Sequence, residues 1–156
     1  FAHKRVFENL HQRFSYIFET VNKYPGAPTI DEIEIDKNTP FLLGDKNIIP
    51  IEAFHGKLPV LGFKIDDVAY LTDVKTIAKS ELEKLKGIEV LIINTLRHEK
   101  HHSHLNLAEA LELIKEIKPK KTYLTHISHV LGFHKEVEKT LPKNVYLAYD
   151  TLKLKL

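Results

Sequence analysis

Apolar and polar positions follow two different patterns along the chain. In residues 4–20, apolar side chains such as Val6, Leu10 and Phe14 recur at helical spacing, which predicts an amphipathic helix. From 30 to 72 the pattern changes to short β-like runs separated by Asp, Asn, Gly and Pro, which is typical of an antiparallel meander. We therefore expect the first half to be mostly β after one helix.

The second half alternates strand and helix patterns. GIEVLIIN at 87–94 is a continuous apolar run of strand length, which predicts a central strand buried on both faces. LNLAEALELIKEI at 105–117 places apolar residues on one helix face and ends before Pro119. The remaining expected elements are a short helix at 79–86 with Ser80 as N-cap, a strand at 121–125, a helix over roughly 130–140, and a closing pair of strands at 144–150 and 152–156. Together they predict one mixed α/β domain over residues 1–156.

Composition narrows the class of protein. The 156 residues carry a formal net charge of +2, with 43% apolar and 28% charged residues, as in ordinary soluble domains. This weak charge argues against a dedicated nucleic-acid or membrane surface, and no apolar run approaches the roughly 18 residues of a membrane span. Cysteine is absent, so no disulfide or thiolate is available, and a reducing, cytoplasmic compartment is expected.

Residues that can bind metal fall where the expected strands end. His55, Asp73 and His126 each directly follow a β-like run, and the cluster His101–His104 lies between a strand and a helix. If these ends share one edge of the sheet, imidazoles and a carboxylate converge, a donor set suited to Zn²⁺, Mn²⁺ or Fe. Singly, each residue has an ordinary explanation as a solvated loop histidine or a turn aspartate. Their joint order and placement favour a metal site.

Several stretches of the chain are similar to one family of enzymes. They are RFSYIF…YPGAPTI, AFHGKLPVLGFKI, AYLTD, INTLR…HHSHLNLAEAL, YLTHISH and LAYD. In this order, over nearly the whole chain, they resemble the metallo-β-lactamase-fold hydrolases, in the branch of the phosphonate-pathway cyclic phosphodiesterase and ribonuclease Z. The resemblance implies an α/β fold of the αββα sandwich type.

The resemblance also implies roles for single residues. His55, Asp73 and His126 match metal ligands, with Asp73 as the carboxylate that bridges two metals. His104 matches the histidine that protonates the leaving oxygen or steadies the attacked phosphate, and His101 is the alternative for this role. The implied cofactors are two divalent metal ions in the parent protein, Zn²⁺ first and Mn²⁺ or Fe as alternatives, with a bridging hydroxide as the nucleophile.

The implied function is that of a metal-dependent hydrolase, a phosphodiesterase with a small phosphodiester substrate. Arg97 and Lys100 are candidates for phosphate contact, although solvated surface charge also explains Lys100. The charge balance does not point to nucleic acid as the substrate, which the resemblance to ribonuclease Z leaves open. Thioesters and lactones are alternative substrates, because one fold supports many reactions. We place His129 as support at the start of the next helix.

The chain departs from the family in one respect, because the defining H-x-H-x-D-H motif is absent. Since the chain also starts at Phe1 and contains no Met, we expect the C-terminal part of a larger domain whose N-terminal part is missing. His55, Asp73 and His126 alone would form an incomplete site, so reduced or no metal and an inactive fragment are expected. A non-catalytic structural or interaction module with vestigial ligands is the alternative. Unpaired strands and exposed apolar faces would favour a homodimer.

Overall fold

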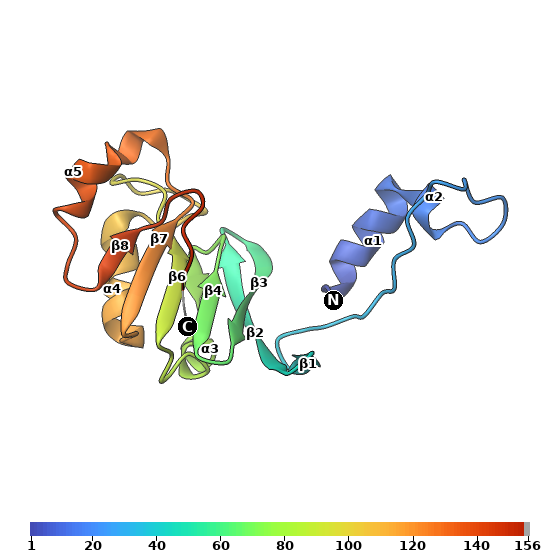
Figure 1. The fold of residues 1–156 in the computed structure, drawn as a ribbon, viewed down its shortest axis with the longest axis horizontal. Helices are drawn as coiled ribbons and strands as arrows, with labels where there is room; N and C mark the ends of the chain where they lie inside the picture. The colour runs from blue at the N-terminus through green and yellow to red at the C-terminus, as the bar shows by residue number, and fades with distance from the viewer. Residues whose placement is uncertain (155–156) are drawn as a thin grey trace.

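The structure, a computed structural model, describes residues 1–154 (Figure 1). The helices are α1 Lys4–Arg13, α2 Ser15–Phe18, α3 Lys79–Glu83, α4 Leu107–Ile117 and α5 His134–Glu138, with a 3₁₀ turn η1 at His129–Leu131. The strands are β1 Phe41–Leu43, β2 Lys46–His55, β3 Leu58–Ile65, β4 Val68–Leu71, β5 Thr76–Ile77, β6 Val90–Asn94, β7 Lys121–Thr125 and β8 Val145–Leu147. All eight strands belong to one sheet with the order β1-β2-β3-β4-β6-β7-β8, and β5 pairs with β2.

Strand direction divides the sheet into two parts. The first four strands pair antiparallel, as the pattern of residues 30–72 predicts. The strands β4, β6, β7 and β8 pair parallel to one another. Parallel strands place their carboxyl ends at one edge of a sheet, where sites in α/β proteins gather. The residues that follow β4, β7 and β8 therefore reach a common edge.

One face of the sheet carries the hydrophobic core. Leu71 of β4 lies in register with Ile93 of β6, and both are fully buried. Leu124 of β7 and Ala110 of α4 belong to the same buried cluster. The strand β6 is buried at four of its five positions, with only Ile92 intermediate, so the expected burial on both faces is confirmed.

The opposite face of the sheet is more open. A row of side chains crosses it in register from β3 to β8, and its members are Phe63, Tyr70, Ile92, Tyr123 and Tyr146. Tyr70 and Tyr146 are 45% and 36% exposed. The mixed α/β class is thus confirmed, and the described residues form one sheet with α3, α4 and α5 contributing to its buried side.

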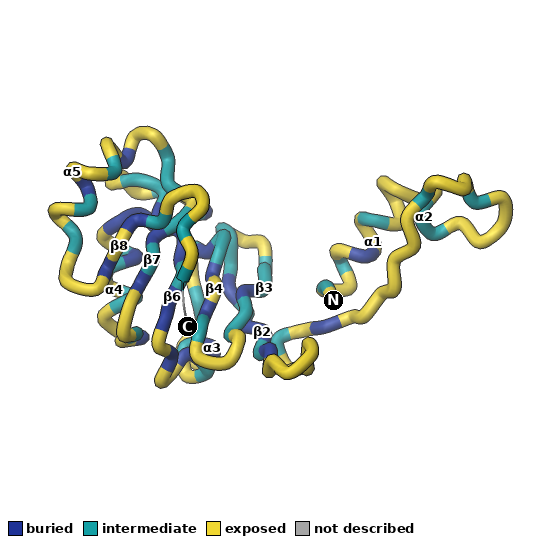
Figure 2. Tube along the Cα trace, viewed as in Figure 1, coloured by how far each residue is buried: buried dark blue, intermediate teal, exposed yellow. Residues whose placement is uncertain are grey.

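Residues 1–40 form an arm beside the sheet that is mostly exposed (Figure 2). Several contacts connect it to the rest of the fold or close it on itself, among them an ion pair of Lys37 with Glu52 at 2.7 Å. Arg5 Nη2 donates to the carbonyl of Pro59 at 2.7 Å, the rings of Phe1 and Phe41 stack at 4.2 Å, and Ala2 forms an isolated bridge with Glu34.

Several expected elements differ from those observed. The expected helix at 4–20 breaks at Phe14, because the backbone there leaves the helical region. The β-like run at 29–35 contains only the isolated bridge at Glu34. Ser80 is not the N-cap of α3, since Ala78 occupies that position without a side-chain bond.

The C-terminal third also differs in detail. The expected helix at 130–140 divides into η1 and α5 at Gly132, whose φ of +118° is incompatible with a continuous helix. Residues 152–154 form no strand, and the rest of that expected strand, 155–156, lies outside the described residues. The short strand β5 had no signal in the sequence pattern.

Candidate metal centre

The parallel strands bring Asp73 and His126 together. Asp73 follows β4 and His126 follows β7, and Nδ1 of His126 lies 3.3 Å from Oδ1 of Asp73. The φ of His126 is +56°, in the left-handed region that residues other than glycine seldom adopt. Such backbone conformations gather at functional sites, where the surrounding structure maintains them.

His55 and His104 approach the same point from other elements. Nε2 of His55, the last residue of β2, lies 3.2 Å from Nε2 of His104, which precedes α4. The ring centres of His104 and His126 are 4.7 Å apart. The four side chains therefore converge at one edge of the sheet, although their positions in the sequence span more than seventy residues.

The donor atoms divide into groups differently from the family assignment. Those of His55, Asp73 and His104 all lie within 4.8 Å of one another. The family assignment instead joins His126 to His55 and Asp73. His55 and Asp73 belong to both sets, and the sets differ in whether His104 or His126 is the third member. The roles of the single histidines stay predictions.

The donor set fits a divalent transition metal. Two ligand atoms on a tetrahedral zinc ion, each about 2.0–2.1 Å from it, are roughly 3.4 Å apart. The separations of 3.2 Å between the His55 and His104 nitrogens and 3.3 Å between His126 and Asp73 are close to this value. Imidazole nitrogen and carboxylate oxygen are also the donors that zinc accepts besides thiolate.

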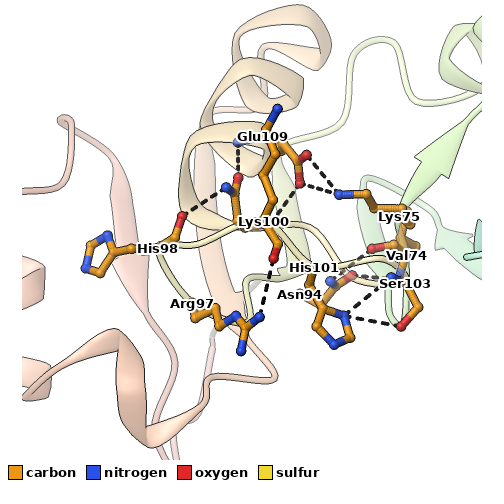
Figure 3. A network of polar contacts seen from close by, with 10 residues as sticks. Val74, Lys75, Asn94, Arg97, His98, Lys100, His101, Ser103 and Glu109 are labelled. Carbon is orange, nitrogen blue, oxygen red and sulfur yellow. Dashed lines mark hydrogen bonds and ion pairs between the residues drawn. The ribbon is translucent and has the colours of Figure 1, made fainter.

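His101 lies at the side of this group. Its ring centre is 5.0 Å from that of His104, and its Nδ1 accepts a hydrogen bond from the backbone amide of Ser103 at 3.3 Å (Figure 3). This bond places the ring proton of neutral His101 on Nε2. His101 is therefore near the centre but has one nitrogen already engaged.

Two histidines of the cluster have a lowered pKa. Burial lowers the pKa of His104, and the neighbouring imidazoles of His126 and His55 lower it further, against a smaller opposing effect of Asp73. The pKa of His101 is lowered by burial and then by the charges of His102 and Arg97. Both shifts favour the neutral imidazole, which is the form that coordinates metal.

Asn94 holds the loop that carries Asp73. This fully buried residue ends β6, accepts a hydrogen bond from Val74 N at 2.7 Å and donates one to Val74 O at 3.0 Å (Figure 3). The amide side chain thus acts like a neighbouring strand toward the residue after Asp73. In the sequence, Asn94 stands out only as a polar residue that closes an apolar run, and this was the available signal for its role.

The histidine loop between β6 and α4 is fixed by a second network. Asn106 caps α4 in a reciprocal capping box with Glu109, and its Nδ2 donates to the carbonyl of His98 at 2.9 Å. Lys75 donates to both carboxylate oxygens of Glu109 at 2.8 and 2.7 Å (Figure 3). These contacts connect the Asp73 loop with the start of α4.

The candidate phosphate contacts differ in their surroundings. Arg97 Nη2 donates to the carbonyl of Lys100 at 3.3 Å, so part of its guanidinium is already used within the loop (Figure 3). Lys100 is exposed. Within residues 1–154, no helix has both the length and the apolar character that crossing a membrane requires.

Comparison with known proteins relates the chain to one superfamily. The family model described as beta-lactamase superfamily domain matches residues 1–127. A solved structure described as a new diphosphatase from the PhnP family is 31% identical, with a TM-score of 0.87 over 98% of this chain and 56% of that chain. The human short form of tRNase Z shares the fold, with 16% identity and a TM-score of 0.65 over 97% of this chain and 63% of that chain.

A curated relative, an octanoyltransferase of Porphyromonas gingivalis, is 40% identical over 102 residues, which are 65% of this chain and 20% of that protein. The chain thus spans a fifth of this relative and little more than half of the PhnP-family structure. A match to one fifth of a protein does not carry that protein's activity to this chain. The family model, in contrast, covers 127 of the 156 residues, and the chain belongs to the beta-lactamase superfamily, with the metallo-β-lactamase fold that it shares with the PhnP-family structure.

Proposed function

We propose that this chain is part of a metal-dependent phosphodiesterase that acts on a small phosphodiester. The observation that carries the proposal is the convergence of His55, Asp73, His104 and His126 at one sheet edge. The similarity to a diphosphatase at 31% identity supports phosphate chemistry over the cleavage of thioesters or lactones.

The side chains would have separate roles in such a reaction. Asp73, His55 and His126 would hold metal, with Zn²⁺ as the first candidate and Mn²⁺ or Fe as alternatives. A bound divalent metal lowers the pKa of water toward neutrality and neutralises charge on phosphoryl oxygens. His104 would hold a proton near the leaving oxygen or steady the phosphate, roles that an imidazole side chain can fill.

Donor number limits what this chain does alone. A zinc site with catalytic function uses three protein ligands, and a second metal needs further donors. The chain lacks H-x-H-x-D-H, and the described cluster offers three histidines and one carboxylate. We therefore propose that a complete two-metal site requires donors beyond these, and that this chain alone holds metal weakly and turns over little substrate.

The test is metal content and hydrolysis of bis-p-nitrophenyl phosphate by the full-length protein supplied with Zn²⁺ or Mn²⁺. Asp73→Asn should lower metal affinity by more than about 100-fold and abolish turnover, since even residues behind the ligands contribute 10–100-fold. His11→Gln, on the exposed arm, serves as the matched control and should leave both unchanged. A fully metal-loaded protein without turnover would contradict the phosphodiesterase proposal.

The absent motif supports a second candidate, a non-catalytic structural or interaction module with vestigial ligands. The same experiment separates the two, because a vestigial cluster would bind no metal even in the full-length protein. A protein that binds metal but cleaves thioesters or lactones instead would identify the other hydrolase alternative.

A further inference from the structure

Lys75 contacts two other segments that lie near the candidate metal ligands. It stands two residues after Asp73, and its backbone amide donates to the carbonyl of Phe54 at 2.7 Å, directly before His55. Its side chain crosses to the first turn of α4, where Nζ donates to both carboxylate oxygens of Glu109 (Figure 3). The end of β2, the loop after β4 and the start of α4 therefore meet at one residue.

Glu109 is bonded in turn to the segment that carries His104. Its Oε2 accepts a hydrogen bond from the backbone amide of Asn106 at 3.0 Å, two residues after His104. A backbone bond joins the same two segments, because Leu105 N donates to the carbonyl of Val74 at 3.0 Å. The loop after β4 and the segment before α4 are thus connected by backbone and side chains together.

A further bond extends this network toward His126. Asn106 Nδ2 donates to the carbonyl of His98 at 2.9 Å, and Nε2 of His98 donates to the carbonyl of Leu131 at 3.0 Å. Leu131 ends the η1 turn, five residues after His126. One chain of hydrogen bonds therefore passes from the loop after β4 to the segment that follows His126.

The ion pair of Lys75 and Glu109 is more enclosed than an ordinary surface pair. Its side chains are 19% and 31% exposed, whereas those of Lys115 and Glu112, later in α4, are 69% and 72% exposed. Exposed pairs contribute little, because water and salt screen their charges and the long side chains lose entropy when they are held. A partly enclosed, charge-assisted pair with both carboxylate oxygens engaged has a defined geometry, so it can fix one loop against another.

We propose that Lys75 and Glu109 are positioning residues of the metal centre, which hold the Asp73 loop against the segment of His104 and thereby strengthen metal binding. The inference rests on the metal centre of the proposed function and adds the pair that orders its loops. The two charged groups bond to each other and to backbone, so they act through the loops and not on the substrate. Partners that lie behind metal ligands contribute about 10–100-fold to metal affinity.

The test is the zinc affinity of the full-length protein without substrate, measured by competition with a chromophoric chelator. Lys75→Met removes the ammonium group but keeps a long side chain, and it should weaken zinc binding about tenfold or more. Lys75→Arg keeps the charge and can bond both carboxylate oxygens, so it should retain most of the affinity. The absorption spectrum of the Co²⁺-loaded protein should change in Lys75→Met and stay nearly the same in Lys75→Arg, because a displaced Asp73 alters the ligand geometry.

Glu109→Gln tests the pair from its other side, because it removes the charge but keeps an oxygen that can accept from the Asn106 amide. It should also weaken zinc binding. The double variant Lys75→Met/Glu109→Gln should lose little more than either single variant, since both changes remove one contact. Lys115→Met, in the exposed pair of the same helix, is the matched control and should bind zinc as the wild-type protein does.

Zinc affinity that is unchanged in both Lys75→Met and Glu109→Gln would overturn the inference, as would full additivity of the two losses. A lower free energy of unfolding with unaltered zinc affinity would assign the pair a purely structural role and would overturn it too. A protein that shows the expected affinity differences but no turnover of bis-p-nitrophenyl phosphate would support the positioning role and contradict the phosphodiesterase proposal.

Discussion

Apolar side chains differ in burial between the arm of residues 1–40 and the sheet of residues 41–154. In the sheet, Leu71, Leu91 and Leu124 are fully buried. In the arm, Phe7 is the buried residue of α1, and Val21 is 74% exposed. An amphipathic pattern therefore predicts a helix but does not say what covers its apolar face.

Because helix α1 is short, its stability depends on what covers its apolar face. Isolated helices shorter than about 12–15 residues are marginal in water, so α1 with ten residues depends on packing. Its connection to the sheet includes the bond from Arg5 to Pro59 and the stacking of Phe1 on Phe41. Regions with few buried contacts open more readily than the core.

The largest expected effect comes from removing a core side chain of the sheet. Leu91→Ala should lower the free energy of unfolding by about 2–5 kcal/mol, because Leu91 is fully buried and a cavity remains. Val21→Ala in the arm is the control and should change it by less than about 0.5 kcal/mol. Urea unfolding measures both, and equal losses would show that the arm is as well packed as the sheet.

A smaller loss of stability is expected at the edge of the sheet, where Asn94 at the end of β6 bonds to Val74 in the loop after β4. Asn94→Leu removes both hydrogen bonds to Val74 and should lower the free energy of unfolding by about 1–3 kcal/mol, because two backbone groups lose their partners. Hydrogen exchange at the Val74 amide should become faster. Asn38→Leu, at an exposed turn within the arm, should do neither. Unaltered exchange at Val74 in Asn94→Leu would refute the positioning role of Asn94.

The smallest expected effect depends on pH. Burial raises the pKa of Glu109, but hydrogen bonds from Lys75 and the Asn106 backbone outweigh it, so the pKa lies below the ordinary value of 4.5. Near and below pH 4.5, the folded state then binds fewer protons than the unfolded state. The contribution of Glu109 to the free energy of unfolding is therefore complete above pH 4.5 and is lost as the pH falls below it.

The unfolding free energy should fall less in Glu109→Gln than in the unchanged protein as the pH drops below 4.5. The difference should be up to about 1 kcal/mol, the value for an ion pair such as Lys75–Glu109. Unfolding by urea at several pH values measures this. Glu112→Gln, whose ion pair with Lys115 is exposed, is the comparison and should leave the pH dependence nearly as it is. Identical pH profiles for Glu109→Gln and the unchanged protein would contradict the assignment.

Elements that depend on local contacts can be predicted from the sequence, whereas those that depend on distant contacts cannot. The strand at 121–125 was predicted residue for residue, since an apolar run of strand length is a local signal. The helix at 105–117 was predicted two residues too long at its start, because the capping box at Asn106 sets its first turn. The short strand β5 was missed, because two residues carry no periodicity.

The sequence by itself determined which residue types stand at the strand ends and in which order, because these depend on local pattern and on the resemblance to a family. Only the tertiary structure decided that His104 comes within 3.2 Å of His55, that Asn94 holds Val74, and that Lys75 bonds Glu109 at the start of α4. The reason is physical: such contacts join residues distant in sequence, and the order of the parallel strands in the sheet determines which strand ends meet.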